Sequence, residues 1–441
     1  MAIYDGFIFF NEIDLLELRL RELDAVVDCF VLVEAPVTFS GRAKPLHFAD
    51  AIGQFAPWRD KIAHIVVDDM PGGPDPWRRE QHQRNAILRG LTGAADDDAV
   101  IVSDCDEIPS ADAVRRWPGD ARMFDQLLSY YWINCVGGGW SGSRILPIRE
   151  LRRLGGPHAV RHTVFAGIPD GGWHISYAGG PERIAQKVAA YSHTELNDRR
   201  FLEPRHLTLA LAFGMDLFDR AGHGWALTTL DERFPAAVRG DRERFGHLVC
   251  DALFHECWYS NEQLTWLSAA VARVADLRGA VVEVGCWEGR STIAIANACH
   301  PEPVAAIDTW LGNADEHPDH PTVALARERD VFRQFEANVR ALTRGNVDVV
   351  RRDCHAALAD WASPVKFAHV DASHDYRSVR RSIEACRRLL VPGGIICGAD
   401  FLTADLSRVD LEGGVERAVR ELLPGFELNH SFWSWTRPAD A

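Results

Sequence analysis

The segment Ala99-Val-Ile-Val-Ser-Asp-Cys-Asp-Glu-Ile-Pro109 is an apolar run that ends in three carboxylates. Its first four residues, three of them Val or Ile, predict a short buried strand that stops where the polar residues begin. Because side chains alternate along an extended chain, Asp104 and Asp106 lie on the same side. Together they can bind one hard cation such as Mg²⁺ or Mn²⁺, whose other positions a nucleotide diphosphate would fill.

This acidic segment has two interpretations. In a nucleotide-sugar transferase, a cation held by Asp104 and Asp106 neutralises the charge that builds on the departing diphosphate. In the simpler alternative, Asp106 or Glu107 only caps a helix that begins near Ser110. The remainder of the first half favours the cation site.

Other strand-like runs in the first half also lead into acids. The runs and their acids are 3–10 with Glu12, 29–35 with Glu34, and 61–69 with Asp68. Helical patterns fit between them, notably over 77–91. Repeated strand–helix alternation predicts an α/β fold with a mainly parallel sheet, whose strand ends share one crevice. The acids are therefore expected to point into one place.

Several motifs occur together between residues 3 and 245. They are Asn11-Glu12, Val33-Glu34-Ala35, Val67-Asp68-Asp69-Met70-Pro71, Gln83-Arg84-Asn85, Ser103-Asp104-x-Asp106-Glu107 and Gly171-Gly172-Trp173-His174. In this combination the sequence resembles glycosyltransferase family 17. The resemblance implies a GT-A-like fold, a UDP-sugar donor carrying GlcNAc or a related sugar, a divalent metal (Mn²⁺ or Mg²⁺), and inversion at the anomeric carbon. It matches Asp104 and Asp106 to the metal and diphosphate motif, and Glu34 to the acid near uracil and ribose.

An inverting transferase needs a general base to take the proton of the acceptor hydroxyl. We favour Asp170, because Pro169-Asp-Gly-Gly172 reads as a turn that presents a carboxylate just before Trp173 and His174. An ordinary Asx-turn is an equal alternative. His174 either completes the metal's coordination or is structural. Trp173 and Trp140 are candidates to stack on a sugar ring, although a core position is the safer expectation for an aromatic residue.

The composition limits the classes of function. The chain has 441 residues, 63 of them acidic and 48 basic, so we expect two domains and no nucleic-acid partner. Its ten cysteines form no C-x-x-C pair, which indicates reduced thiols in a cytoplasmic protein. We expect no export signal, because Asp5, Asn11 and Glu12 interrupt the first apolar run, and no membrane span, because no apolar run reaches about 18 residues. A homo-oligomer is left open.

A second α/β pattern follows a charged junction at 231–244, which gives expected domains of 1–245 and 246–441. The segment Ala280-Val-Val-Glu-Val-Gly-Cys-Trp-Glu-Gly-Arg-Ser-Thr292 predicts a strand, a glycine turn and a helix. Glycines let the backbone approach a ligand, although tight turns also need them for steric reasons. Asp308 ends the next strand 19 residues after Gly289, near the spacing of about 20 expected for a ribose-binding carboxylate.

The later strands, 349–354, 367–371 and 393–401, complete the pattern. No phosphate-binding lysine follows the glycines, which argues against a nucleoside triphosphate site. A nicotinamide dehydrogenase would share the first strand–helix–strand unit, but the phrase Leu389-Leu-Val-Pro-Gly-Gly-Ile-Ile396 favours a methyl donor. The second half resembles Rossmann-like class I S-adenosylmethionine-dependent methyltransferases. The residues that this resemblance assigns to the cofactor are Glu283, Gly285, Gly289, Ser291, Asp308 and Asp353.

Within that superfamily, Val370-Asp-Ala-Ser-His-Asp-Tyr376 and Gly398-Ala-Asp-Phe401 resemble the metal-dependent sugar O-methyltransferases. The resemblance matches Asp371 and Asp400 to metal ligands and His374 to the general base. The chain has Ala399 where the family often has a second acid, so the metal can be weak or absent. Alternatively, Asp371 contacts the methionine end of the cofactor and His374 only caps the following helix.

We therefore expect a bifunctional enzyme that acts on a nucleotide sugar and on a small-molecule or glycan acceptor. One half would transfer the sugar, and the other would methylate the sugar or the acceptor. Two alternatives are that the halves act on unrelated molecules, and that the second half is only a binding module that recruits partners.

Overall fold

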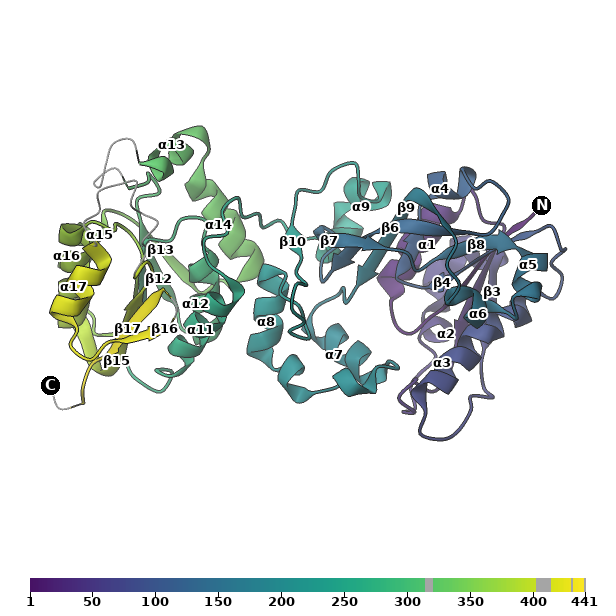
Figure 1. Cartoon of the computed structure of the whole chain (residues 1–441), viewed down its shortest axis with the longest axis horizontal. Helices are drawn as coiled ribbons and strands as arrows, with labels where there is room; N and C mark the ends of the chain where they lie inside the picture. Colours follow the sequence, from purple (N-terminus) through teal and green to yellow (C-terminus); the bar gives the residue numbers. More distant parts are fainter. Residues whose placement is uncertain (314–319, 402–413, 430, 440–441) are drawn as a thin grey trace. The chain divides into compact units, whose positions relative to one another are not determined.

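The computed structural model describes residues 1–313, 320–401, 414–429 and 431–439. The chain forms two compact units, 1–250 and 251–441, coloured from purple to teal and from green to yellow in Figure 1. Both units are α/β, as predicted. Among the described residues, no helix is both long enough and apolar enough to cross a bilayer.

The first unit is built on a ten-stranded sheet with the order β10-β7-β6-β8-β4-β1-β2-β3, to which β5 and β9 attach. Its strands are β1 (Ile3–Ile8), β2 (Cys29–Glu34), β3 (Ile62–Val66), β4 (Ala99–Asp104), β5 (Glu107–Pro109), β6 (Arg122–Tyr130), β7 (Cys135–Trp140), β8 (Arg144–Pro147), β9 (Ala166–Ser176) and β10 (Ala226–Leu227). Strands β4, β1, β2 and β3 are parallel, and β8 pairs antiparallel with β4. The prediction of parallel strands is therefore confirmed for these four, whose carboxyl ends carry the acids. The expectation of a mainly parallel sheet is wrong for the whole, because β5, β7, β8 and β10 pair antiparallel with their neighbours.

Short helices connect these strands. The α-helices are α1 (Ile13–Leu23), α2 (His47–Ala51), α3 (Pro76–Asn85), α4 (Ala111–Arg115), α5 (Ile148–Arg153), α6 (Pro157–Arg161), α7 (Pro181–Ala190), α8 (Pro204–Phe213), α9 (Ala236–Gly240) and α10 (Arg242–Phe245). Helix α4 is capped by Ser110, whose hydroxyl accepts from the Ala113 amide at 3.1 Å. The alternative in which Asp106 or Glu107 caps this helix is therefore wrong.

The central strands of the first unit are buried on both faces, which explains their unbroken apolar runs. Phe30, Leu32 and Ile101 face the cluster that contains Leu16 of α1. Their neighbours on β2 and β4 point the other way and pack against Ile87. The strand ends are consequently held rigidly, and so are the polar residues that follow them.

A buried ion pair connects α1 to the acidic segment. Both side chains of the pair, Asp5 on β1 and Arg19 on α1, have no exposed surface. Arg19 also donates to the Ser103 hydroxyl at 2.6 Å and to the Glu107 carbonyl at 2.8 Å. Burial alone would lower the pKa of Arg19, but the Asp5 carboxylate outweighs burial and raises it. Arg19 therefore fixes the path of the chain between β4 and β5.

The second unit contains a seven-stranded sheet with the order β13-β12-β11-β14-β15-β17-β16. Its strands are β11 (Ala280–Val284), β12 (Val304–Asp308), β13 (Val347–Arg351), β14 (Val365–Val370), β15 (Leu390–Gly398), β16 (Glu427–Asn429) and β17 (Phe432–Thr436). The first five are parallel, and β17 runs antiparallel to β15. The direction of winding reverses between β11 and β14, which is where sheets of this kind place their ligands.

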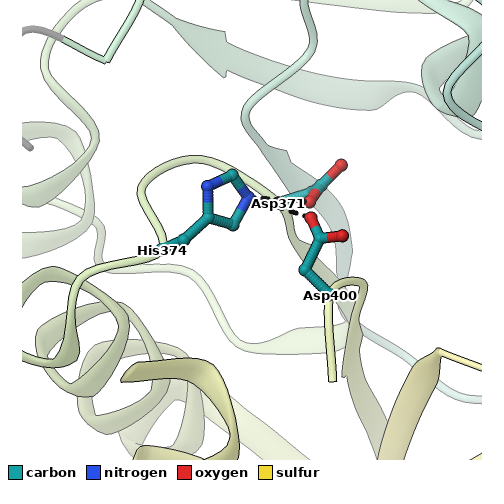
Figure 2. Close-up of side chains that lie close together, drawn as sticks. All are labelled: Asp371, His374 and Asp400. Atoms are coloured by element: carbon teal, nitrogen blue, oxygen red, sulfur yellow. Dashed lines mark ion pairs between the residues drawn. The ribbon is translucent and has the colours of Figure 1, made fainter. Parts of the chain in front are cut away.

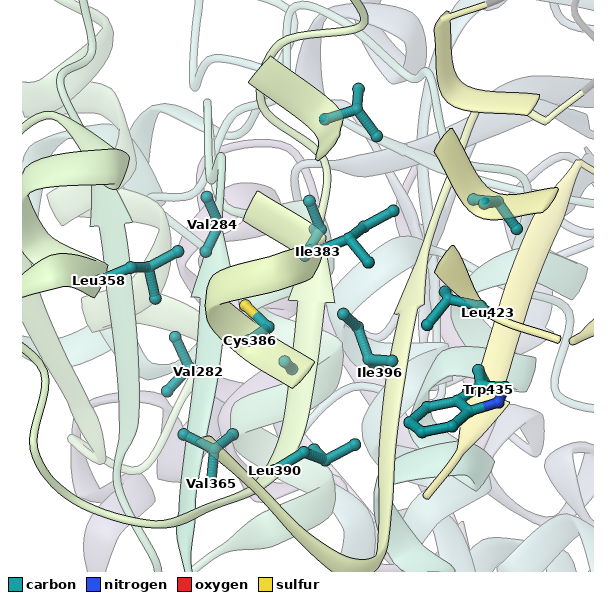
Figure 3. Close-up of a cluster of buried hydrophobic side chains, with 14 of the residues drawn as sticks. Val282, Val284, Leu358, Val365, Ile383, Cys386, Leu390, Ile396, Leu423 and Trp435 are labelled. Carbon is teal, nitrogen blue, oxygen red and sulfur yellow. The ribbon is translucent and has the colours of Figure 1, made fainter. Parts of the chain in front are cut away.

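Helices cover both faces of this second sheet. They are α11 (Asn261–Ala272), α12 (Arg290–Cys299), α13 (Pro321–Glu328), α14 (Val331–Leu342), α15 (Cys354–Ala359), α16 (Tyr376–Leu389) and α17 (Gly414–Leu422). Figure 3 shows the core on one face, where Ile383 of α16 packs with Val282 and Val284. Val281 points to the opposite face and packs with Leu267 of α11. Because both faces of β11 are buried, every residue of this strand except Glu283 is apolar.

We predict that Asp5→Asn lowers the free energy of unfolding by about 3–5 kcal/mol, because it leaves the buried Arg19 guanidinium without its counter-ion. Asp112→Asn is the matched control, since the Asp112–Arg115 pair is exposed and should contribute less than about 1 kcal/mol. Urea denaturation of the intact chain, followed by fluorescence, makes the comparison. Equal destabilisation by the two variants would contradict a role for the buried pair.

Candidate active sites

The acidic turn, Asp104–Glu107, lies between the end of β4 and the start of β5. Strand β5 pairs with β9 so that Glu107 lies opposite His174. This pairing brings His174 to the acidic turn from a segment almost seventy positions further along the chain. The predicted proximity of the Trp173-His174 motif to the carboxylates is therefore present in the fold.

Asp104 is paired with two arginines. Arg84 Nη1 of α3 donates to Asp104 Oδ1, and Arg161 Nη2 of α6 lies 3.4 Å from Oδ2. Burial alone would raise the pKa of Asp104, but the two guanidinium groups outweigh burial and lower it. Asp104 is therefore ionised at neutral pH.

Asp106 has a different cation. Lys187 Nζ of α7 donates to Asp106 Oδ2 at 2.5 Å, and His174 Nε2 lies 3.7 Å from the same oxygen. Only 7% of the Asp106 side chain is exposed. Burial would raise the pKa of Asp106, but Lys187 and His174 lower it well below its ordinary value. Asp104 and Asp106 are close enough for their charges to interact.

Glu107 completes the acidic turn as a buried anchor. Its carboxylate accepts from Arg161 and, at 2.6 Å, from the Trp140 indole nitrogen. The Trp140 side chain is 38% exposed, and its ring lies 4.8 Å from the His174 ring. Trp173, in contrast, is buried and donates to the Arg233 carbonyl. Of the two tryptophans, Trp140 is thus the one with a surface that a sugar could contact.

The donor set at the acidic turn fits a cation that arrives with a phosphate ligand. Mg²⁺ is commonly bound by one or two carboxylates together with substrate phosphates and waters. Asp104 and Asp106 supply that number of carboxylates. They belong to no group of three or more closely spaced metal-ligating side chains among the described residues, so a full protein cage is absent there.

Glu34, the residue predicted to contact the nucleotide, is held by partners within the protein. Its side chain has no exposed surface, and its carboxylate accepts from the Phe48 and Ala49 amides and pairs with His64. Burial would raise the pKa of Glu34, and these hydrogen bonds lower it. A contact between Glu34 and a nucleotide stays a prediction.

The turn expected at 169–172 is not formed. These residues belong to β9, whose register against β6 shifts between Ile168 and Gly172. Asp170 lies at this irregularity, where its φ is 51° and its side chain is exposed. Its backbone carbonyl accepts from Ser110 and Arg116. Since β5 separates this position from Asp106, the structure does not bring Asp170 to the acidic turn.

Sequence reasoning included Arg84 in a motif but missed the other two cations of this site. Arg161 and Lys187 lie on short helices that carry no recognisable motif. Their only signal is indirect: several carboxylates at buried strand ends require counter-ions, and burial of an unpaired charge is very unfavourable.

The second unit has a cavity of about 770 Å³ at the carboxyl ends of β11, β12 and β14. Predicted site residues that line it are Gly285, Ser291, Asp308, Asp353, Asp371, His374 and Asp400. Glu283 and Gly289 do not line it. The structure therefore gathers most of the predicted cofactor and metal residues into one cavity.

The glycine loop after β11 is shaped by contacts within the protein. A Cβ on Gly285, where φ is 86°, would lie 2.1 Å from the Asp371 carbonyl oxygen. One on Gly289 would lie 3.1 Å from the Phe335 ring. Asp308 accepts from the Cys286 and Trp287 amides at 2.7 and 3.0 Å, so it holds the loop in place. Both glycines are therefore required for steric reasons, and Gly285 also lines the cavity.

The other predicted cofactor residues have structural partners as well. Glu283 is completely buried and accepts from the Thr292 hydroxyl of α12, and burial raises its pKa to about 8. Asp353 caps α15 by accepting from the Ala356 amide at 2.9 Å. Glu283 consequently supports the cavity wall from behind, and Asp353 reaches the cavity from a helix terminus.

Three predicted residues converge inside the cavity, as Figure 2 shows. His374 Nε2 lies 3.0 Å from Asp400 Oδ2 and 3.8 Å from Asp371 Oδ1. One ligand atom from each residue lies within 4.8 Å of the others, which is close enough for the three to share one metal ion. The two carboxylates suit Mn²⁺ or Mg²⁺, although no second acid adjoins Asp400. The donor set therefore fits a divalent metal.

His374 is not a helix cap, so that alternative is wrong. The cap of α16 is Asp375, whose carboxylate accepts from the Arg377 and Ser378 amides. His374 instead precedes the helix and turns into the cavity.

Tyr259, which sequence reasoning missed, positions Asp371. Its hydroxyl donates to Asp371 Oδ2 and lies 3.0 Å from His369 Nε2. Burial lowers the pKa of His369 to about 4, so this ring is neutral and its Nε2–H can donate to the tyrosine oxygen. Burial would raise the pKa of Asp371, but His374 and the other neighbours lower it. No local pattern links Tyr259 to a residue more than a hundred positions away.

Comparison with known proteins identifies the first half. Residues 1–237 match the model of glycosyltransferase family 17. The human and rat β-1,4-mannosyl-glycoprotein 4-β-N-acetylglucosaminyltransferases are each 28% identical to this chain over 219 residues, which cover 41% of this chain and 41% of the relative. The match thus spans less than half the length of these curated relatives.

The second half matches a different family. Residues 282–401 match the model of a methyltransferase domain. The O-methyltransferase NovP has 18% identity and a TM-score of 0.33, covering 41% of this chain and 81% of its own. An O-methyltransferase from Bacillus cereus has 17% identity and a TM-score of 0.29, covering 41% and 82%. The first family model covers more than half of the sequence, so this chain belongs to glycosyltransferase family 17, and its second half carries a methyltransferase domain.

Proposed function

We propose that this chain is a bifunctional transferase. Residues 1–245 transfer GlcNAc or a related sugar from a UDP-sugar to an acceptor, with inversion. Residues 246–441 transfer a methyl group from S-adenosylmethionine to an oxygen of the sugar or the acceptor. The observation that carries the proposal is that each unit places convergent carboxylates at the carboxyl ends of its own parallel strands.

In the first unit, the acidic turn is the proposed donor site. Asp104 and Asp106 would hold Mn²⁺ or Mg²⁺, which when bound neutralises charge on the departing diphosphate. Arg84 and Arg161 keep Asp104 ionised and oriented. Trp140 offers an exposed ring face beside His174, where the sugar can stack. Asp170, the residue predicted as the general base, lies at the opposite end of β5 from the acidic turn.

In the second unit, the cavity is the proposed site of methyl transfer. A carboxylate has about four acceptor positions, and Asp308 uses three for backbone amides, so a ribose hydroxyl can still bind it. The acceptor hydroxyl oxygen attacks the methyl carbon as the carbon–sulfur bond breaks, and its proton passes to His374. Asp371 and Asp400 would hold a divalent metal that lowers the pKa of that hydroxyl.

Asp106→Ala should reduce UDP release from a UDP-sugar in the presence of Mn²⁺ by about 100-fold or more, because it removes one of two proposed metal ligands. The assay uses the intact chain with a panel of UDP-sugars. Asp112→Ala, an exposed acid on α4, is the control and should retain full turnover. Affinity for S-adenosylmethionine should stay unchanged in both variants. Normal turnover by Asp106→Ala would place the donor site elsewhere.

His374→Ala should reduce methyl transfer by about 10²–10⁴-fold while leaving affinity for S-adenosylmethionine unchanged, because it removes the proposed general base. Asp375→Ala is the matched control: it removes the cap of α16, so it should lose about 1 kcal/mol of stability and keep its chemistry.

Titration with Mn²⁺ separates two roles of His374. If His374 is only the base, His374→Ala leaves the affinity for Mn²⁺ unchanged. If His374 is a metal ligand, the substitution lowers that affinity. A His374→Ala variant that is fully active per folded molecule would disprove both roles.

A further inference from the structure

Lys187 is paired with Asp106, one of the two proposed metal ligands of the first unit. Its Nζ lies 2.5 Å from Asp106 Oδ2 and 4.0 Å from Glu12 Oε1. The Asp106 side chain is nearly inaccessible, so its carboxylate needs a counter-ion at all times. In the folded chain Lys187 provides that charge.

Lys187 differs from the arginines at the same turn in how firmly it is held. Arg84 bridges Glu80 and Asp104, and only 2% of its side chain is exposed. Arg161 bridges Asp104 and Glu107, with 13% exposed. Lys187 makes one hydrogen bond to a carboxylate, that of Asp106, and its other neighbours, Glu12 and the Tyr177 ring, lie 4.0 and 5.4 Å away. Its side chain is 24% exposed, more than that of either arginine. A lysine ammonium on a flexible stem can also change partners more easily than a guanidinium fork.

A divalent ion and the Lys187 ammonium cannot share Asp106 without strong repulsion, because both would lie within a few ångströms of one carboxylate. A nucleotide diphosphate changes this balance. It adds negative charge that a metal ion and a displaced ammonium can both neutralise.

We propose that Lys187 is a resident counter-ion that keeps a metal ion off Asp106 until a nucleotide diphosphate binds, and then pairs with that diphosphate. This inference rests on the proposed UDP-sugar transfer. Its consequence is that metal and nucleotide bind together: each raises the affinity for the other by the same factor, and Lys187 sets that factor.

The experiment measures binding of Mn²⁺ by the paramagnetic resonance signal of the free ion, with and without UDP. All chains carry Asp400→Ala, so that the group formed by Asp371, His374 and Asp400 does not contribute to the signal. The variants are Lys187→Gln, which removes the charge, and Lys187→Arg, which keeps it. Lys61→Gln is the control, since Lys61 forms an exposed pair with Asp24. Melting temperatures confirm that each variant is folded.

We expect weak Mn²⁺ binding without UDP and at least tenfold tighter binding with UDP in the reference chain and the control. Lys187→Arg, which keeps the charge but changes partners less easily, should bind Mn²⁺ as weakly without UDP and gain less from UDP. Lys187→Gln should bind Mn²⁺ alone about tenfold more tightly and gain little from UDP. If UDP strengthens Mn²⁺ binding equally in the Lys187→Gln and reference chains, the role of Lys187 is wrong and the proposed donor site stands. If no chain binds Mn²⁺ in the presence of UDP, the proposed metal-dependent function and the role of Lys187 both fail.

Discussion

The ion pair between Asp5 and Arg19 is the interaction on which the first site depends. Arg19 is buried on α1 and donates to the carbonyls of Asp104 and Glu107, so it holds the backbone on both sides of Asp106. A turn that carries three carboxylates would otherwise be forced apart by repulsion between like charges. Arg84, Arg161 and Lys187 then balance the side chains themselves.

The second unit solves the related problem with backbone amides in place of cations. The Asp308 carboxylate accepts from the amides of the glycine loop, which fixes the loop and leaves one face of the carboxylate toward the cavity. Deeper in the cavity, Tyr259 and the neutral His369 orient Asp371. In each unit the acids that can bind ligands are therefore positioned by buried partners before a ligand arrives.

Local sequence predicted the parallel strands β1 to β4 and β11 to β15, because buried parallel strands read as apolar runs and their carboxyl ends carry the acids. It did not predict β5 to β10, β16 and β17. Local sequence does not predict which distant strands pair or which distant side chains come into contact. Asp170 was expected in a turn, but it lies within β9, at the point where the pairing of β9 with β6 shifts register. Trp173 proved to be a core residue, whereas Trp140 is exposed at the acidic turn. Arg161, Lys187 and Tyr259 act through contacts with residues 54, 81 and 112 positions away, which no local pattern encodes.

The central claim is that one chain carries two separate ligand sites, one for a UDP-sugar and one for S-adenosylmethionine. Calorimetric titration of the intact chain with UDP plus Mn²⁺, and separately with S-adenosylmethionine, tests it most directly. We expect each chain to bind one equivalent of UDP and one equivalent of S-adenosylmethionine. Saturation with one ligand should not change the titration with the other. Absence of S-adenosylmethionine binding would make the second half a binding module, and competition between the two ligands would contradict the claim of two sites.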